Sequence, residues 1–219
     1  MCYLDEAGFS MTLPPCRSWF PEGERLTVAY EAPQGRRVNA IGAHFTHGPQ
    51  AGRFEFQSWA CLPKSRAKKQ RKTPEEVAAA HGLKVEEVGP IGSERFTQRV
   101  PAFIWRAAGR AGGDCEGWVR ERPLMVVLDN YSVHKSLVME EAKAELKAAG
   151  VHLEYLPSYS PELSRIEPDW NDIKQHHLPV RSFEKVADLK RAVDAALARK
   201  ARQLQQAHTK TINLRRADT

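Results

Sequence analysis

The sequence lacks the cysteine and hydrophobic patterns that mark several classes of protein. Its four cysteines are Cys2, Cys16, Cys61 and Cys115. They form no Cys-x-x-Cys pair and have no matching histidine spacing, which argues against a zinc site. No run approaches the roughly eighteen consecutive apolar residues of a membrane-spanning helix. The N-terminus carries Asp5 and Glu6 where a signal peptide would need a basic start and an apolar core. We therefore expect a cytoplasmic protein with reduced cysteines.

The composition is that of an ordinary globular protein with a basic surplus. The chain has 219 residues, of which 42% are hydrophobic and 27% are charged. This size favours one large domain, or one domain with an extra arm. The formal net charge is +6, and the sequence pI is about 9.2. A basic balance favours a polyanionic partner, of which nucleic acid is the commonest.

A nine-residue window concentrates the positive charge. It holds Lys64, Arg66, Lys68, Lys69, Arg71 and Lys72. This run either contacts DNA phosphates or is a solvated loop, and the sequence leaves both interpretations open. It leads into a short helix with Thr73 as N-cap and Pro74 at the first helical position. Residues 62–93 are therefore predicted to form an insertion or arm on a core.

The hydrophobic pattern predicts an α/β domain with a mixed sheet. The run 124–128 is apolar without alternation, which is typical of a strand buried on both faces. A turn is expected at Gly8 and a hairpin loop at 47–52. Further strands are expected at 1–4, 38–43, 54–59 and 151–156, and helices at 73–81, 94–111, 137–149, 165–177 and 182–206. Hairpins first and parallel crossovers later give a mixed sheet flanked by helices. Residues 201–219 are predicted to be a polar, basic tail that is frayed from Thr209 onward.

Two of the predicted strands end in an aspartate, at Leu4–Asp5 and Leu128–Asp129. Ligands of open α/β sheets collect beyond the carboxyl ends of the strands, so neighbouring strands would bring Asp5 and Asp129 together. Two adjacent carboxylates repel each other unless a cation neutralises them. Mg²⁺ prefers oxygen ligands, and a pair of such ions can promote an in-line displacement at phosphorus. In the alternative interpretation, each aspartate begins a turn or caps the next helix.

A third acid is expected from the helix after the last strand, and Glu167 is the candidate. Pro168 is predicted to open that helix, which leaves Glu167 exposed at its start. In the alternative interpretation, Ser164 and Glu167 form a capping box, in which the glutamate only satisfies backbone donors. Asp169 and Asp172 are rival ligands that lie on turns farther from the cap.

Three segments carry motifs with a specific order of residues. One is LDNYSVHKS at 128–136, in which Asp129, Asn130 and His134 follow a strand. Another is LPSYSPELSRIE at 156–167, and the third is LDEAGF at 4–9. Together they resemble the second-aspartate motif, the Leu-Pro-x-Tyr-Ser-Pro-Glu-Leu-Asn-x-Ile-Glu signature and the first-aspartate strand of IS630/Tc1-mariner DDE transposases. Trp170 and Lys174 also fall where the signature expects them.

The resemblance implies an RNase H-like fold for residues 1–200, with DDE transposase activity. Asp5, Asp129 and Glu167 would form the catalytic triad and would bind Mg²⁺ or Mn²⁺, with two ions implied. The ions would promote attack of water, and then of a DNA 3′-hydroxyl, on phosphodiesters. Lys174 would join the basic run as a DNA contact. Residues expected to support the site are Asn130, His134, Tyr159, Ser160 and Pro161.

The implied partner is DNA, both transposon ends and target, bound by a homodimer in the nucleoid and away from membranes. Ser164 stands where the family has Asn, and the 37 positions from 130 to 166 between Asp129 and Glu167 slightly exceed the usual gap. Only four residues precede Asp5, whereas complete transposases carry helix-turn-helix modules there. We therefore expect a separate catalytic reading frame with a helix-turn-helix subunit, a cloned fragment or a truncated relic. Alternative functions are a non-catalytic remnant that binds DNA or a partner, and an RNase H-like nuclease.

Overall fold

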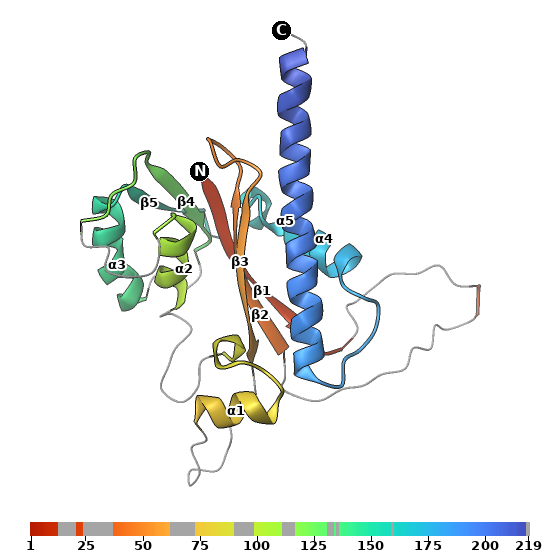
Figure 1. Ribbon diagram of the computed structural model, residues 1–219. Helices are drawn as coiled ribbons and strands as arrows, with labels where there is room; N and C mark the ends of the chain where they lie inside the picture. The colour runs from red at the N-terminus through yellow and green to blue at the C-terminus, as the bar shows by residue number, and fades with distance from the viewer. Residues whose placement is uncertain are drawn as a thin grey trace.

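The computed structural model describes residues 1–12, 21–23, 37–61, 73–89, 99–110, 117–130, 134, 136–158 and 160–217. Its centre is a five-stranded sheet in the order β3-β2-β1-β4-β5 (Figure 1). The strands are β1 (Cys2–Ser10), β2 (Arg37–Phe45), β3 (Phe54–Cys61), β4 (Leu124–Leu128) and β5 (Val151–Tyr155). The first three pair antiparallel, whereas β4 runs parallel to both β1 and β5. This arrangement confirms the predicted α/β class and the mixed sheet flanked by helices.

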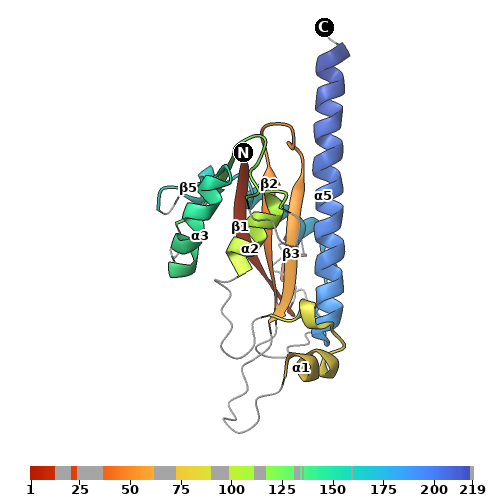
Figure 2. The same cartoon turned by 60° about the vertical axis from the view of Figure 1, so that its left-hand side comes forward.

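Helices cover both faces of the sheet. On one side lie α2 (Arg99–Ala107) and α3 (Leu137–Ala148). On the other lie α4 (Glu167–Asp172), its π-helical continuation η5 (Ile173–His177) and the long α5 (Val186–Ala217), as Figures 1 and 2 show. The short η4 (Pro161–Leu163) leads into α4, while α1 (Pro74–Ala80) and η1 (Val85–Glu87) follow β3. The result is a three-layer sandwich.

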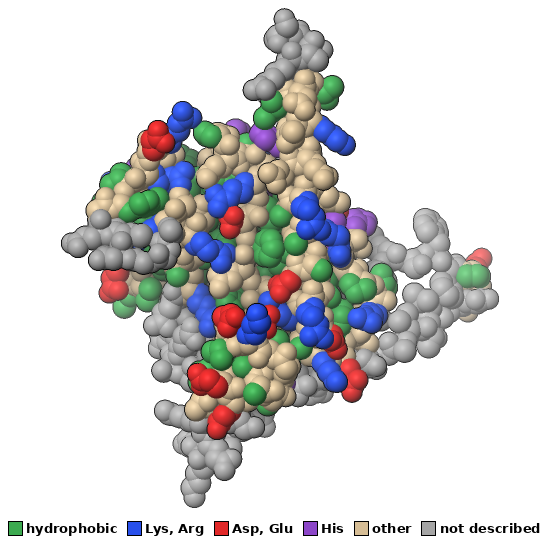
Figure 3. Space-filling model, viewed as in Figure 1, with side chains coloured by type: hydrophobic (Ala, Val, Ile, Leu, Met, Phe, Trp, Pro, Cys, Tyr) green, Lys and Arg blue, Asp and Glu red, His purple; other side chains and the backbone are tan. Residues whose placement is uncertain are grey.

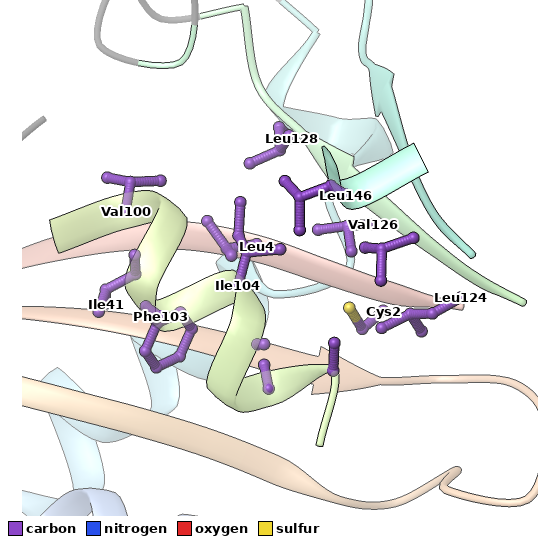
Figure 4. Close-up of a cluster of buried hydrophobic side chains, with 14 of the residues drawn as sticks. Cys2, Leu4, Ile41, Val100, Phe103, Ile104, Leu124, Val126, Leu128 and Leu146 are labelled. Atoms are coloured by element: carbon purple, nitrogen blue, oxygen red, sulfur yellow. The ribbon is translucent and has the colours of Figure 1, made fainter. Parts of the chain in front are cut away.

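Each face of the sheet has its own hydrophobic core. Leu4 and Val126 pack with Phe103 and Leu146 beneath α2 and α3 (Figure 4). The opposite core joins side chains of β1 and β2 to α4 and α5, and includes Ala7, Phe9, Trp170, Val193 and Leu197. Because successive side chains of a strand point to opposite faces, odd-numbered residues of β1 face α4 and α5. Asp5 therefore belongs to the face that also carries Glu167.

The structure departs from the predicted elements in two places. β1 runs through Gly8 to Ser10, because β2 pairs with it along its whole length, so the turn predicted at Gly8 is wrong. The final helix begins at Val186 and continues to Ala217. The prediction of a frayed tail from Thr209 onward is therefore wrong, since no glycine or proline interrupts residues 207–217. Among the described residues, no helix is both long and apolar enough to cross a membrane.

Candidate active site

The β-ladder sets Asp5 beside Asp129. Leu4 pairs with Leu128 in the parallel ladder of β1 and β4, so the next residue of each strand is an aspartate at the same level. β4 ends at Leu128, whereas β1 continues past Asp5 to Ser10. The sequence had suggested that Asp5 lies at the end of a strand, whereas in the structure it lies within β1. The neighbouring position of the two aspartates is nevertheless the one predicted.

Asp5 occupies an environment that disfavours its charge. Burial raises the pKa of Asp5 to about 7, the backbone amide of Glu6 acts in the opposite direction, and the carboxylates of Glu6, Glu167 and Asp129 raise it further. Its Oδ2 accepts a hydrogen bond of 3.1 Å from the indole nitrogen of Trp170. All three predicted triad members therefore interact electrostatically, and burial and the neighbouring carboxylates disfavour a charged Asp5 unless a cation compensates it.

Trp170 is held in place by an aromatic cluster and a glycine. Its ring makes edge-to-face contacts with Phe9 and Phe54, at centroid separations of 6.4 and 5.8 Å. Gly42, the ladder partner of Asp5, lies under the ring. A Cβ atom at Gly42 would come within 2.9 Å of Cζ2 and Cη2 of Trp170. The absence of a side chain at Gly42 thus lets Trp170 reach Asp5.

Glu167 is the first residue of α4, and its side chain is half-buried. Ile166 precedes it as N-cap without a side-chain capping bond, and Pro168 stands in the first turn. Because α4 begins at Glu167 itself, Ser164 is not its N-cap, and the helix start does not have the capping-box arrangement. The buried side chains of Ile166, Trp170 and Ile173 dock the helix on the sheet.

The rival acids of α4 are committed to a cation from α5. The Nζ atom of Lys200 lies 3.0 Å from both Asp169 and Asp172. His44 Nδ1 stands 2.7 Å from the second oxygen of Asp169, although the two atoms are not aligned as a hydrogen bond. Although burial lowers the pKa of Lys200, its bonds to Asp172 and Asp169 raise it overall. We interpret these acids as ties between α4 and α5 rather than as metal ligands.

His134 joins the two strands on the other side of the site. Its side chain is fully buried, with Nδ1 2.8 Å from Asp129 Oδ1 and Nε2 3.0 Å from Glu6 Oε1. Its carbonyl accepts a hydrogen bond from the hydroxyl of Tyr155. Burial lowers the pKa of His134, but its bonds to Asp129 and Glu6 raise it to about 10. The raised pKa favours an imidazolium ring, which would place one positive charge between the two carboxylates.

The remaining predicted residues have separate surroundings. Asn130 donates a hydrogen bond of 3.0 Å to Ser158. Ser160 precedes Pro161, which opens η4 in the turn before α4. Lys174 lies over the ring of Phe9, 5.8 Å from its centroid, so it is in part a packing residue. Tyr159 and the basic run Lys64, Arg66, Lys68, Lys69, Arg71 and Lys72 lie outside the described residues.

Glu6 is a site residue that the sequence interpretation did not identify. It was noted only as part of an acidic pair, yet it holds His134 against Asp129. Strand alternation could have indicated it, because residue 6 must face away from Asp5 and toward the core under α2 and α3. An acid on that face needs a cationic or hydrogen-bonding partner.

The donor chemistry of this region fits a hard divalent cation. Asp5, Asp129 and Glu167 offer carboxylate oxygens. Asn130 directly follows Asp129, and its Oδ1 is buried without a hydrogen-bond partner among the described residues. In the same part of the chain, however, no three acidic, histidine or cysteine side chains are gathered closely enough to hold an ion. The described residues therefore include carboxylates of the type that bind such a cation, but in this conformation these side chains are not gathered around one point.

Comparison with known proteins gives a consistent result. Residues 92–190 match the family described as DDE superfamily endonuclease, a segment that contains Asp129 and Glu167. No curated protein matches the chain significantly. Solved structures that resemble it include a Mos1 transposase paired-end complex with the left transposon end, at 14% identity, and the Mos1 strand transfer complex, at 16%. Each has a TM-score of 0.49 and covers 94% of this chain and 52% of its own.

A Mos1 mariner paired-end complex with Mn is similar to the same degree, with 15% identity, a TM-score of 0.49 and the same coverage. The chain thus spans about half the length of these transposases. The family match and the strand order are observations separate from the similarity to the Mos1 structures. Residues 92–190 of this chain are thus similar to the family described as DDE superfamily endonuclease.

Proposed function

We propose that this chain is the catalytic domain of an IS630/Tc1-mariner transposase, which hydrolyses phosphodiesters at transposon ends and joins the ends to target DNA. The observation that carries the proposal is the pairing of Leu4 with Leu128, which sets Asp5 and Asp129 side by side. The charge of Glu167 contributes to the raised pKa of Asp5, so the two carboxylates lie within electrostatic range of each other. Three acids that destabilise one another without a cation are typical of a metal site.

Asp5, Asp129 and Glu167 would hold Mg²⁺ or Mn²⁺, as two ions. Bound there, the ions supply positive charge at the phosphate and activate the attacking oxygen. The protein's own residues prepare the ligands. Trp170 fixes one oxygen of Asp5 through its N–H. The imidazolium of His134 fixes Asp129 and offsets its repulsion with Glu6.

Asp129 could bind a metal ion without breaking its contact with His134, because a carboxylate has two oxygens. Oδ1 of Asp129 lies 2.8 Å from Nδ1 of His134, and about half of the Asp129 side chain is exposed. A carboxylate that is hydrogen-bonded through one oxygen can still coordinate an ion, and such a bond orients the ligand. Asn130, Ser160, Pro161 and Tyr159 would shape the loops around this point.

DNA would be the partner, as transposon ends and as target. Lys174 and the run from Lys64 to Lys72 would contact phosphates, so neutralising that run should weaken DNA binding and flatten its salt dependence. Because two ends must be cut and joined together, a homodimer on DNA would be the active form. A separate helix-turn-helix subunit would supply recognition of the ends.

Nicking of duplex DNA by the purified chain tests this function. With Mg²⁺ or Mn²⁺, we expect cleavage by the wild type and at least a hundredfold less by Asp129→Asn, because the substitution removes a ligand. Asp172→Asn is the matched control, since it makes the same chemical change on an acid held by Lys200. Equal loss in both variants, or equal activity in all three proteins, would contradict the proposed site. Cleavage of RNA–DNA hybrids alone would favour an RNase H-like nuclease.

A further inference from the structure

The C-terminal half of α5 differs from the rest of the surface in charge. From residue 195 to 217 the chain has no aspartate or glutamate. The same stretch carries Arg199, Lys200, Arg202, Lys210, Arg215 and Arg216. Of these, Lys200 already forms ion pairs with Asp169 and Asp172, so it is not available to another partner. In Figure 3 the upper part of α5 shows Lys and Arg side chains and no acidic ones.

Polar side chains of this stretch line up on the outer face of the helix. Positions 199, 202, 206, 210 and 213 are spaced by three or four residues, so they share one face. They are Arg199, Arg202, Gln206, Lys210 and Asn213, all exposed, and we call them the outer stripe. Residues 197, 201, 204 and 208, on the opposite face, are buried or half-buried. At 1.5 Å per residue, the stripe is about 21 Å long.

Beyond His208 the helix leaves the body of the protein. His208 lies against Gly52 in the β2–β3 hairpin, so closely that a Cβ atom at Gly52 would come within 2.5 Å of the Cβ of His208. Past this point α5 projects alone, as Figures 1 and 2 both show. The projecting part, from His208 to Ala217, is about 14 Å long. Helices in water depend largely on packing, which indicates that a partner covers this part.

The chemistry of the stripe selects the partner. Arg and Lys bind phosphates, and Gln and Asn side chains donate further hydrogen bonds to phosphate and sugar oxygens. A single helix fits the major groove of B-DNA, which is about 12 Å wide. Among the described residues, Arg202 and Lys210 form no ion pair, so both are available to a polyanion. The exposed apolar side chains nearby, Ile212 and Leu214, are too few to build a helical dimer seam.

We propose that the outer stripe of α5 binds the phosphate backbone of duplex DNA. This inference rests on the proposed function only in taking DNA as the partner, and it does not require the metal site. The stripe starts beside the catalytic helix, because Arg199 donates a hydrogen bond to the carbonyl of His177, the last residue of η5. DNA bound along α5 would therefore lie close to the segment α4–η5, which begins with Glu167.

Binding of a fluorescent DNA duplex, measured by anisotropy in EDTA over a series of salt concentrations, tests the stripe. The variant is Arg202→Gln with Lys210→Gln. The control is Lys147→Gln with Arg191→Gln, which removes the same charge from exposed positions on α3 and on the packed part of α5. Circular dichroism checks that both keep their helix content. Asp129→Asn, which leaves the stripe intact, should bind like the wild type.

We expect the stripe variant to bind several-fold more weakly. Its plot of log K against log salt should be flatter by about 2, because each lost phosphate contact removes about 0.9 from the slope. The control variant should keep more of the wild-type affinity for DNA and more of the wild-type salt slope. Equal slopes for variant and control would overturn the inference. So would unchanged DNA binding accompanied by loss of a dimer, because a second copy would then cover the helix. If the protein binds DNA through the outer stripe but does not nick it, the proposed catalysis is wrong and the inference about the stripe still holds.

Discussion

Trp170 donates its indole N–H to Oδ2 of Asp5 across 3.1 Å, although the two residues are 165 positions apart in the chain. The same ring lies over Gly42, the ladder partner of Asp5. Helix α4, which begins with Glu167, is thereby linked to the strand that carries the first aspartate. Any shift of α4 on the sheet would disturb both acids together.

Trp170→Phe should raise the pH at which the site binds Mn²⁺. In the wild type, binding strengthens as pH rises through about 7, where Asp5 ionises. A hydrogen bond to a charged group contributes about 1.5–3 kcal/mol, and one pKa unit corresponds to about 1.4 kcal/mol. Losing the indole N–H should therefore move the midpoint upward by roughly one unit or more. Mn²⁺ titrations at several pH values measure it.

Phe54→Leu provides the control, because it loosens the packing around Trp170 and keeps the indole N–H. It should lower the free energy of unfolding and leave the midpoint where it is. If both variants shift the midpoint equally, the indole is only a packing group.

Gly42→Ala should destabilise the fold by about 1–3 kcal/mol, as over-packed cores do. The added Cβ would lie 2.9 Å from Trp170 and 3.1 Å from Phe54. Gly8→Ala is the matched control on the neighbouring strand, where the nearest atom, Asn39 Oδ1, lies at an ordinary 3.6 Å. Urea unfolding should separate the two variants, and equal free energies of unfolding would speak against this contact.

His134→Gln should lower stability at pH 7 by about 3 kcal/mol, because it leaves two carboxylates without their cation. That value takes the low end of the range for a broken buried pair, since Asp129 is half exposed. The folded-state pKa of about 10 exceeds the ordinary value of 6.5. The stabilisation is thus complete below pH 6.5 and is lost as pH rises through 10.

The wild type should therefore lose more stability between pH 7 and 10 than His134→Gln does, as followed by urea unfolding at each pH. His152→Gln, at an exposed position on β5, should behave like the wild type. A flat pH dependence for the wild type would mean that His134 is neutral.

Local signals in the sequence predicted much of the fold. Thr73 caps α1, with Pro74 at its start and Glu76 completing a capping box, because those residues satisfy the helix end by themselves. The apolar run of β4 and the positions of Asp129 and Glu167 were predicted in the same way. The length of β1 was not, because β2 sets it by pairing across a distant part of the chain.

Contacts between distant side chains could not be predicted from the sequence. Nothing in the local sequence shows that Lys200 would meet Asp169 and Asp172, or that Glu6 would share His134 with Asp129. Such pairs depend on how α5 docks and on which face of β1 each residue takes. The tail from Thr209 onward was judged by its polarity, whereas a helix that has already formed can continue into a polar segment, because propagation is easier than nucleation.

The most direct test of the account is calorimetric titration of the purified chain with Mn²⁺ at pH 8, where Asp5 is ionised. The central claim is that Asp5, Asp129 and Glu167 bind divalent metal, and the titration needs no DNA substrate. We predict saturable binding that is lost in Asp129→Asn and in Glu167→Gln and is kept in Asp172→Asn. Binding of equal strength in all four proteins, or loss in Asp172→Asn alone, would contradict the claim.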